Sequence, residues 1–139
     1  MKIGVVGMWH LGTVTAGCLA SAGHEVLGFD EQEEVVSRLR EGVLQVAEPG
    51  LAEMIATSFR AGKLAFSSRP GDLTGSEVIW IAYDTPVDEE DRAEVEGVLH
   101  RVENLFPCLR EDSLVIVSSQ FPVGSTRKLE ARFAAGNPG

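Results

Sequence analysis

The amino-acid sequence predicts an α/β fold, in which a mostly parallel sheet carries helices on both faces. Short apolar segments rich in β-branched residues alternate with longer helix-like segments, which is the pattern of repeated βαβ units. Gly23, Gly42 and Gly62 follow three of the helical segments, where glycine commonly ends a helix. Right-handed crossovers then give a doubly wound sheet in the order 3-2-1-4-5, from which a sixth strand would be missing.

The first half of the chain supplies three of the strands. Residues 3–6 form a short apolar strand, and residues 11–22 are small or apolar almost all round, as in a helix packed on a sheet. The second strand is Glu25–Phe29, and residues 31–40 form an amphipathic helix. A loop at 43–49, a helix at Leu51–Arg60, a strand at Leu64–Ser67 and a helical turn at 72–75 complete this half.

The second half begins with a central strand at 77–83, EVIWIAY, in which Trp80 is expected in the core. The acidic run 88–91 is expected to be a solvated loop that leads into a helix at 94–105. Residues 113–118 form the fifth strand, and a turn at 122–124 opens a last helix at 125–134. In such a sheet the ligand crevice lies outside the carboxyl ends of the first and fourth strands.

The net charge of −9 argues against some classes of partner. Binding to nucleic acid or to an anionic membrane needs a basic surface, so we expect neither. The longest apolar runs are too short to span a bilayer, and no secretory signal is visible. Cys18 and Cys108 show no metal or redox spacing and are interpreted as structural, in a cytoplasmic protein. No two histidines share the spacing of ligands, so no metal site is expected.

The segment KIGVVGMWHLG, residues 2–12, is typical of the strand–turn–helix that begins a dinucleotide-binding, Rossmann-type domain. Gly7 allows the tight turn, and Gly12 lets the helix lie close to the strand. Asp30 ends the second strand at about the spacing of the carboxylate that binds the adenosine ribose, which favours NAD over NADP. A P-loop is excluded because the lysine that would reach the phosphates is absent.

Trp9 occupies the position of the middle glycine, whose absence of a side chain normally lets the pyrophosphate approach the backbone. Two interpretations follow. Either the indole swings aside or the turn is rebuilt, and the dinucleotide still binds. Alternatively, the ring closes the pocket in a domain that no longer binds a dinucleotide tightly.

Several ordered motifs resemble the N-terminal NAD-binding domain of the UDP-glucose/GDP-mannose dehydrogenase family. They are the opening segment, HEVLGFD at 24–30, EPGL at 48–51, DTPVDEED at 84–91 and IVSSQFPVGST at 116–126. The resemblance covers nearly the whole chain, and EPGL and PVG in this order are more specific than the glycine turn. They count against other dehydrogenases with a similar opening, such as the 3-hydroxyacyl-CoA or 6-phosphogluconate type.

The resemblance implies a single NAD-binding domain over residues 1–139, the N-terminal part of a longer protein. That family oxidises the C6 alcohol of a nucleotide sugar to a carboxylate with two NAD, and its catalytic residues lie in a later domain. No catalytic residue is therefore expected in this chain, a nucleotide sugar would bind only with a second domain, and a homodimer is left open. The implied cofactor-binding residues are Gly7, Met8, Trp9, His10, Leu11, Gly12, Asp30, Tyr83, Asp84, Thr85, Ser119, Gln120 and Phe121.

The chain also departs from the family pattern. Trp9 replaces glycine, His10 replaces tyrosine, and Val35 stands where a basic residue often helps to bind the adenosine ribose. Asp84 brings a negative charge towards an anionic cofactor, and Ser118 and Gln120 replace the usual lysine and threonine. These changes motivate an alternative, a non-enzymatic Rossmann-fold relative whose crevice is altered or closed.

Overall fold

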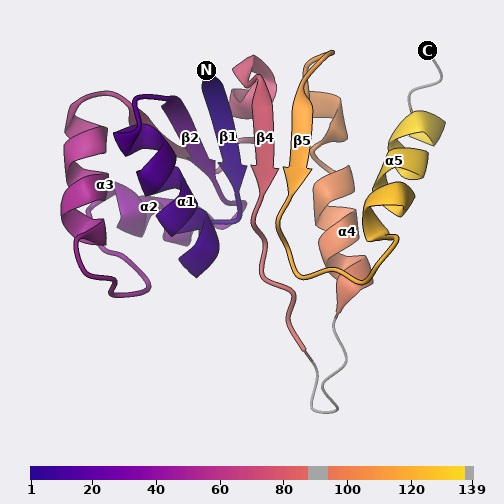
Figure 1. Ribbon diagram of the computed structural model, residues 1–139, viewed down its shortest axis with the longest axis horizontal. Helices are drawn as coiled ribbons and strands as arrows, with labels where there is room; N and C mark the ends of the chain where they lie inside the picture. Colours follow the sequence, from indigo (N-terminus) through magenta and orange to yellow (C-terminus); the bar gives the residue numbers. More distant parts are fainter. Residues whose placement is uncertain (88–93, 137–139) are drawn as a thin grey trace.

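A computed structural model describes residues 1–87 and 94–136, so the predicted acidic loop at 88–91 lies outside the described residues. Five parallel strands form one sheet in the order β3-β2-β1-β4-β5, which confirms the predicted order (Figure 1). The strands are β1 (Lys2–Val6), β2 (Glu25–Phe29), β3 (Leu64–Ser67), β4 (Val78–Ile81) and β5 (Leu114–Val117). The helices are α1 (His10–Ser21), α2 (Glu33–Arg40), α3 (Leu51–Arg60), α4 (Val95–Glu103) and α5 (Ser125–Gly136), with 3₁₀ segments at Pro70–Gly75 and Phe106–Cys108.

Helices cover both faces of the sheet because successive strand residues point to opposite sides. Val5 belongs to a core that α1, α2 and α3 close, whereas its neighbour Val6 belongs to a second core closed by α4 and α5. Both valines are fully buried. The doubly wound architecture therefore follows from apolar residues at consecutive positions of a central strand, as parallel sheets require.

Two element boundaries differ from the sequence prediction for identifiable reasons. The helix α2 begins at Glu33 rather than at residue 31, because the Asp30 carboxylate accepts the N–H of Gln32 and holds the intervening residues in a turn. Strand β4 ends at Ile81 rather than at residue 83, because its partner β1 ends opposite it at Val6. Tyr83 thus leaves the sheet and enters the crevice region.

Two other expectations were wrong in part. Cys18 was expected within an apolar helix but is exposed, because α1 packs on the sheet and on α3 and leaves a third face open. Trp80 is only partly buried: it packs against the first core while its indole N–H donates to the Ser118 hydroxyl at 2.9 Å.

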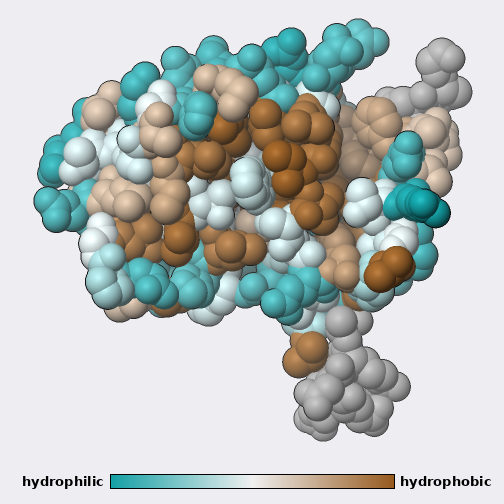
Figure 2. Space-filling model, viewed as in Figure 1, coloured by the Kyte–Doolittle hydropathy of each residue, from teal (hydrophilic) through white to brown (hydrophobic). Residues whose placement is uncertain are grey.

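Apolar residues also reach the surface over the β4–β5 part of the sheet (Figure 2). The side chain of Leu114 lies on the same face as that of Val78, its partner in the register, and Leu114 is 59 % exposed. No helix in the described ranges is long and apolar enough to cross a membrane. The crevice described below opens at the other end of the sheet, where the strands finish.

Candidate functional site

Gly7 and Gly12 are both required by the turn between β1 and α1. Gly7 has φ +91°, and a Cβ added there would lie 2.9 Å from the backbone nitrogen of Tyr83. A Cβ on Gly12 would lie 1.8 Å from the carbonyl oxygen of Gly7, which no real structure tolerates. These two glycines therefore serve the fold itself, independently of any ligand.

The backbone at position 9, unlike that at positions 7 and 12, does not require a glycine. The Trp9 backbone has φ −81° and ψ −154°, an extended conformation that any L-residue adopts. The tryptophan therefore puts no strain on the backbone at this position of the turn. The indole is 49 % exposed and stands at the edge of a cavity, so it changes what can approach the turn and not the turn itself.

The Asp30 carboxylate stabilises this turn by accepting backbone hydrogen bonds. Its Oδ2 accepts the N–H of Met8 at 2.9 Å, and its Oδ1 accepts the N–H of Gln32 at 3.1 Å. The residue is only 5 % exposed, and Met8 beside it is fully buried in the first core. A carboxylate oxygen has two acceptor sites, so each oxygen of Asp30 keeps one for a ligand hydroxyl.

The N-terminus of α1 points its backbone donors at the same place. The first backbone bond in this helix runs from the N–H of Thr13 to the carbonyl of Trp9, at 3.0 Å. The N–H groups of His10 and Leu11 precede it, and no acidic side chain occupies the first turn. Unpaired N–H groups and the helix dipole together favour an anion such as a diphosphate.

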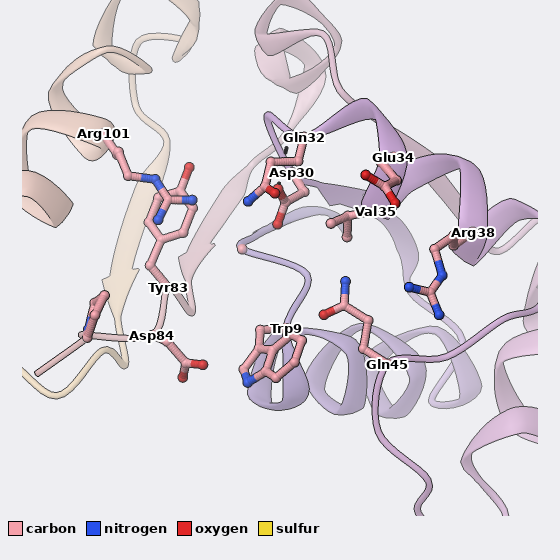
Figure 3. A pocket seen from close by; sticks show the side chains of 12 residues that line it. Trp9, Asp30, Gln32, Glu34, Val35, Arg38, Gln45, Tyr83, Asp84 and Arg101 are labelled. Atoms are coloured by element: carbon pink, nitrogen blue, oxygen red, sulfur yellow. Dashed lines mark hydrogen bonds between the residues drawn. The ribbon is translucent and has the colours of Figure 1, made fainter.

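A cavity of about 400 Å³ opens beside the turn (Figure 3). It brings together five of the residues singled out from the sequence, namely Gly7, Trp9, Asp30, Tyr83 and Asp84. Val35, which the sequence places where a basic residue often helps to bind the adenosine ribose, also lines the cavity. Sequence reasoning did not single out the other lining residues, which are Gln32, Glu34, Arg38, Gln45, Pro86 and Arg101. Position next to a recognised motif could have indicated some of them, such as Gln32 and Glu34 after Asp30, but not Arg101.

The remaining predicted site residues lie outside this cavity. Met8 and Gly12 are buried beneath the turn, Leu11 is 45 % exposed, and the His10 ring pairs with Glu48 at 2.8 Å. Gln120 is exposed, and Phe121 packs against the second core.

Two hydroxyls that follow neighbouring strands have no hydrogen-bond partner among the residues that the structure describes. The Oγ1 of Thr85, after β4, and the Oγ of Ser119, after β5, are buried and have no hydrogen-bond partner in the described part of the chain. A buried polar atom without a partner is costly unless a ligand or water satisfies it. These hydroxyls offer polar contacts in addition to those of the residues that line the cavity.

On the cavity wall near α4, three side chains from distant segments meet. The hydroxyl of Tyr83 donates to Glu31 at 3.0 Å, and Glu31 is ion-paired with Arg101. Burial raises the pKa of Tyr83, and the neighbouring Glu31 charge adds to this. Burial would also raise the pKa of Glu31, but the close positive charge of its ion-pair partner Arg101 outweighs it and leaves that pKa lowered. Glu31 is therefore the ionised partner.

The cavity carries charges of both signs. Asp30, Glu34 and Asp84 contribute carboxylates, while Arg38 and Arg101 contribute guanidinium groups. No group of three or more potential metal ligands occurs among the residues that the structure describes. The arrangement can bind an elongated polar molecule through backbone donors, carboxylates that accept from hydroxyl groups, and planar side chains.

A parallel sheet in this order, with a glycine turn at a helix N-terminus and an acid at the end of β2, defines a dinucleotide-binding domain of the Rossmann class. The chain belongs to the UDP-glucose/GDP-mannose dehydrogenase family: the model of that family's NAD binding domain matches residues 1–137. The cofactor of this family of domains is NAD.

Individual relatives agree with this assignment. The UDP-glucose 6-dehydrogenase of Pseudomonas aeruginosa is 34 % identical over 94 % of this chain and 29 % of its own length. The UDP-N-acetyl-D-mannosamine dehydrogenase of Pyrococcus horikoshii is 33 % identical over 93 % of this chain and 31 % of its own. A solved structure of the UDP-D-ManNAc dehydrogenase of Pyrococcus horikoshii superposes with a TM-score of 0.90 at 30 % identity, covering 97 % of this chain and 32 % of that one. The chain thus spans about a third of the length of the relatives it matches.

Proposed function

We propose that this domain binds NAD across the carboxyl ends of β1 and β4, with the adenosine half in the cavity beside Asp30. The observation that carries the proposal is the ordinary backbone at Trp9. Because the backbone at Trp9 is unstrained, the indole does not prevent α1 from beginning at His10 with its first N–H groups at the crevice. The diphosphate then lies against these donors, and the indole must lie to one side of it.

Individual residues take distinct parts in this proposal. The backbone of Gly7–Gly12 holds the diphosphate, and the unused acceptor sites of Asp30 take ribose hydroxyls. The unpartnered hydroxyls of Thr85 and Ser119 bind the nicotinamide half. NAD supplies the hydride acceptor when bound, and the domain supplies binding and orientation.

For the whole protein we propose oxidation of a nucleotide sugar, with the substrate bound by a further domain. The relatives named above support this, since their names give nucleotide-sugar substrates and they are about three times as long. A cytoplasmic location fits two cysteines outside any disulfide, because reducing compartments keep thiols reduced. A homodimer remains part of the proposal.

Calorimetric titration of this chain with NAD, NADH and NADP tests the binding proposal. We expect NAD and NADH to bind, and NADP to bind at least about tenfold more weakly, because a 2′-phosphate would approach the Asp30 carboxylate. Tryptophan fluorescence of Trp80→Phe, in which Trp9 is the single remaining indole, should change as NAD is added. Absence of heat and of fluorescence change at millimolar NAD would refute the proposal.

A second candidate is a scaffold whose crevice takes a different ligand, and Trp9 and Asp84 favour it because both line the cavity. Trp9→Gly separates the two candidates. A gain of about tenfold or more in NAD affinity would mean that the indole obstructs the native crevice. An unchanged affinity would place the indole beside the bound cofactor and leave the first candidate standing.

A further inference from the structure

Side chains from three separate segments contact one another and form one wall of the site: Glu31, Tyr83 and Arg101. Glu31 follows β2, Tyr83 follows β4, and Arg101 belongs to α4. The Arg101 guanidinium carbon lies 3.8 Å from the centre of the Tyr83 ring, so the cation rests on the aromatic face. Glu31 pairs with Arg101 and also accepts the Tyr83 hydroxyl. The guanidinium is therefore restrained on one face by the Tyr83 ring and at its Nε by the ion pair with Glu31.

This wall faces the cavity. Tyr83 and Arg101 both line it, and in Figure 3 they lie on the side opposite Val35 and Arg38. Tyr83 is 4 % exposed, whereas the Arg101 side chain keeps 34 % of its surface exposed. The tyrosine covers one face of the guanidinium. The part of the Arg101 side chain that remains exposed is available to a ligand.

A fixed guanidinium plane binds aromatic rings by stacking and by cation–π attraction. In a dinucleotide only the two bases are aromatic planes. The base nearest to Arg101 is the one attached to the ribose at Asp30, because Asp30 lines the same cavity while Ser119 does not. That base is adenine.

We propose that Arg101 is the surface on which the adenine ring stacks, and that Glu31 is a positioning residue that holds Arg101 in place. The proposal rests on the proposed binding of NAD in this crevice. Arg38 is the rival cation in the cavity, but the described residues give it no ion pair or hydrogen bond that would hold its plane. Ordering a flexible arginine on binding would offset much of the gain from stacking.

The experiment uses the full chain and the fluorescent nucleotide 1,N6-etheno-AMP, whose emission changes when its base stacks. AMP, NAD and nicotinamide mononucleotide then compete with it. Arg101→Lys keeps the charge and removes the plane, and should weaken etheno-AMP, AMP and NAD by about five- to tenfold while leaving nicotinamide mononucleotide unchanged. Glu31→Gln should weaken the same three ligands by a smaller factor.

Two matched variants complete the test. Arg38→Lys should change affinity by less than about twofold if Arg101 is the stacking surface. Arg132→Lys removes the plane of an arginine that pairs with Glu96 and Glu103 away from the cavity, and should alter thermal stability alone.

The outcomes separate this inference from the proposed function. Unchanged AMP affinity in Arg101→Lys, or an equal loss for nicotinamide mononucleotide, would overturn the stacking role while NAD binding stood. A larger loss in Arg38→Lys would move the stacking surface to the opposite wall. Failure of the unaltered chain to bind NAD or AMP would remove the proposed function and this inference together.

Discussion

The N–H of Met8 donates to the buried carboxylate of Asp30 at 2.9 Å, which joins the turn after β1 to the end of β2. Asp30 reaches in the other direction to the N–H of Gln32 and so delays the start of α2. Asp30 was recognised in the sequence by its spacing from the glycine turn, which is typical of the carboxylate that binds the ribose. In the structure the same carboxylate also accepts hydrogen bonds that hold the fold together. The structural role can be tested by measuring stability.

Asp30→Asn should destabilise the fold as well as weaken NAD binding. An amide has one acceptor oxygen, so one of the two backbone N–H groups would face an NH₂ group and lose its bond. We expect a loss of about 1–3 kcal/mol in the free energy of unfolding, measured by urea denaturation. Glu34→Gln is the control, since Glu34 lines the same cavity but is exposed. Equal stability of Asp30→Asn and the unaltered chain would contradict the bracing role.

Ser119→Ala and Ser118→Ala form a matched pair of adjacent hydroxyl deletions. Ser118 Oγ accepts from Trp80 and donates to the Ile81 carbonyl, both at 2.9 Å, so its removal should cost about 1 kcal/mol or more in unfolding free energy. The Oγ of Ser119 has no such partner within residues 1–87 and 94–136, so its removal should leave stability unchanged or slightly raised.

For NAD affinity we expect the opposite order of effects, with Ser119→Ala having the larger effect of the two variants. If Ser119 binds the nicotinamide half, Ser119→Ala should lower NAD affinity by roughly fivefold while AMP affinity stays constant. Calorimetry with both ligands measures this difference. An AMP affinity that falls in parallel would count against a role restricted to the nicotinamide half.

The ion pair of Glu31 with Arg101 should make stability depend on pH in the acid range. The folded-state pKa of Glu31 lies below its ordinary value of 4.5, so the pair stabilises the fold above that value. This contribution is lost as the pH falls from about 4.5 through the lowered pKa.

Urea denaturation of the unaltered chain and of Glu31→Gln between about pH 3 and pH 6 measures this contribution. The stability difference between them should be largest near the top of that range and shrink as the pH falls. Because Glu31 is 41 % exposed, solvent screens the pair and the difference should be modest. A difference that grows on acidification would show that the sign is wrong.

The sheet and its order were predictable because the information is local and periodic. Each apolar strand segment, such as Glu25–Phe29, is followed by a helical segment, and the handedness of crossovers leaves few orders for five strands. The boundaries were less predictable. The start of α2 depends on a side-chain hydrogen bond from Asp30, which residue spacing alone does not reveal.

The site divides in the same way. Gly7, Trp9 and Asp30 were recognisable because short motifs fix their place relative to a strand end, and they do line the cavity. Glu31 and Arg101 lie 70 positions apart and carry no motif, so nothing in the linear pattern joins them. Their contact forms only when α4 packs behind β4 and brings its arginine over Tyr83.

The sequence by itself determined the family, the parallel sheet and the place of the glycine turn, because these follow from periodicity and from residues close together along the chain. Tertiary structure alone decided whether Trp9 distorts that turn and which side chains form the cavity walls. The physical reason is that the packed surroundings, and not the residue type alone, decide which φ and ψ angles Trp9 adopts and whether they are strained. Ion pairs and stacked planes likewise need elements that meet only after folding.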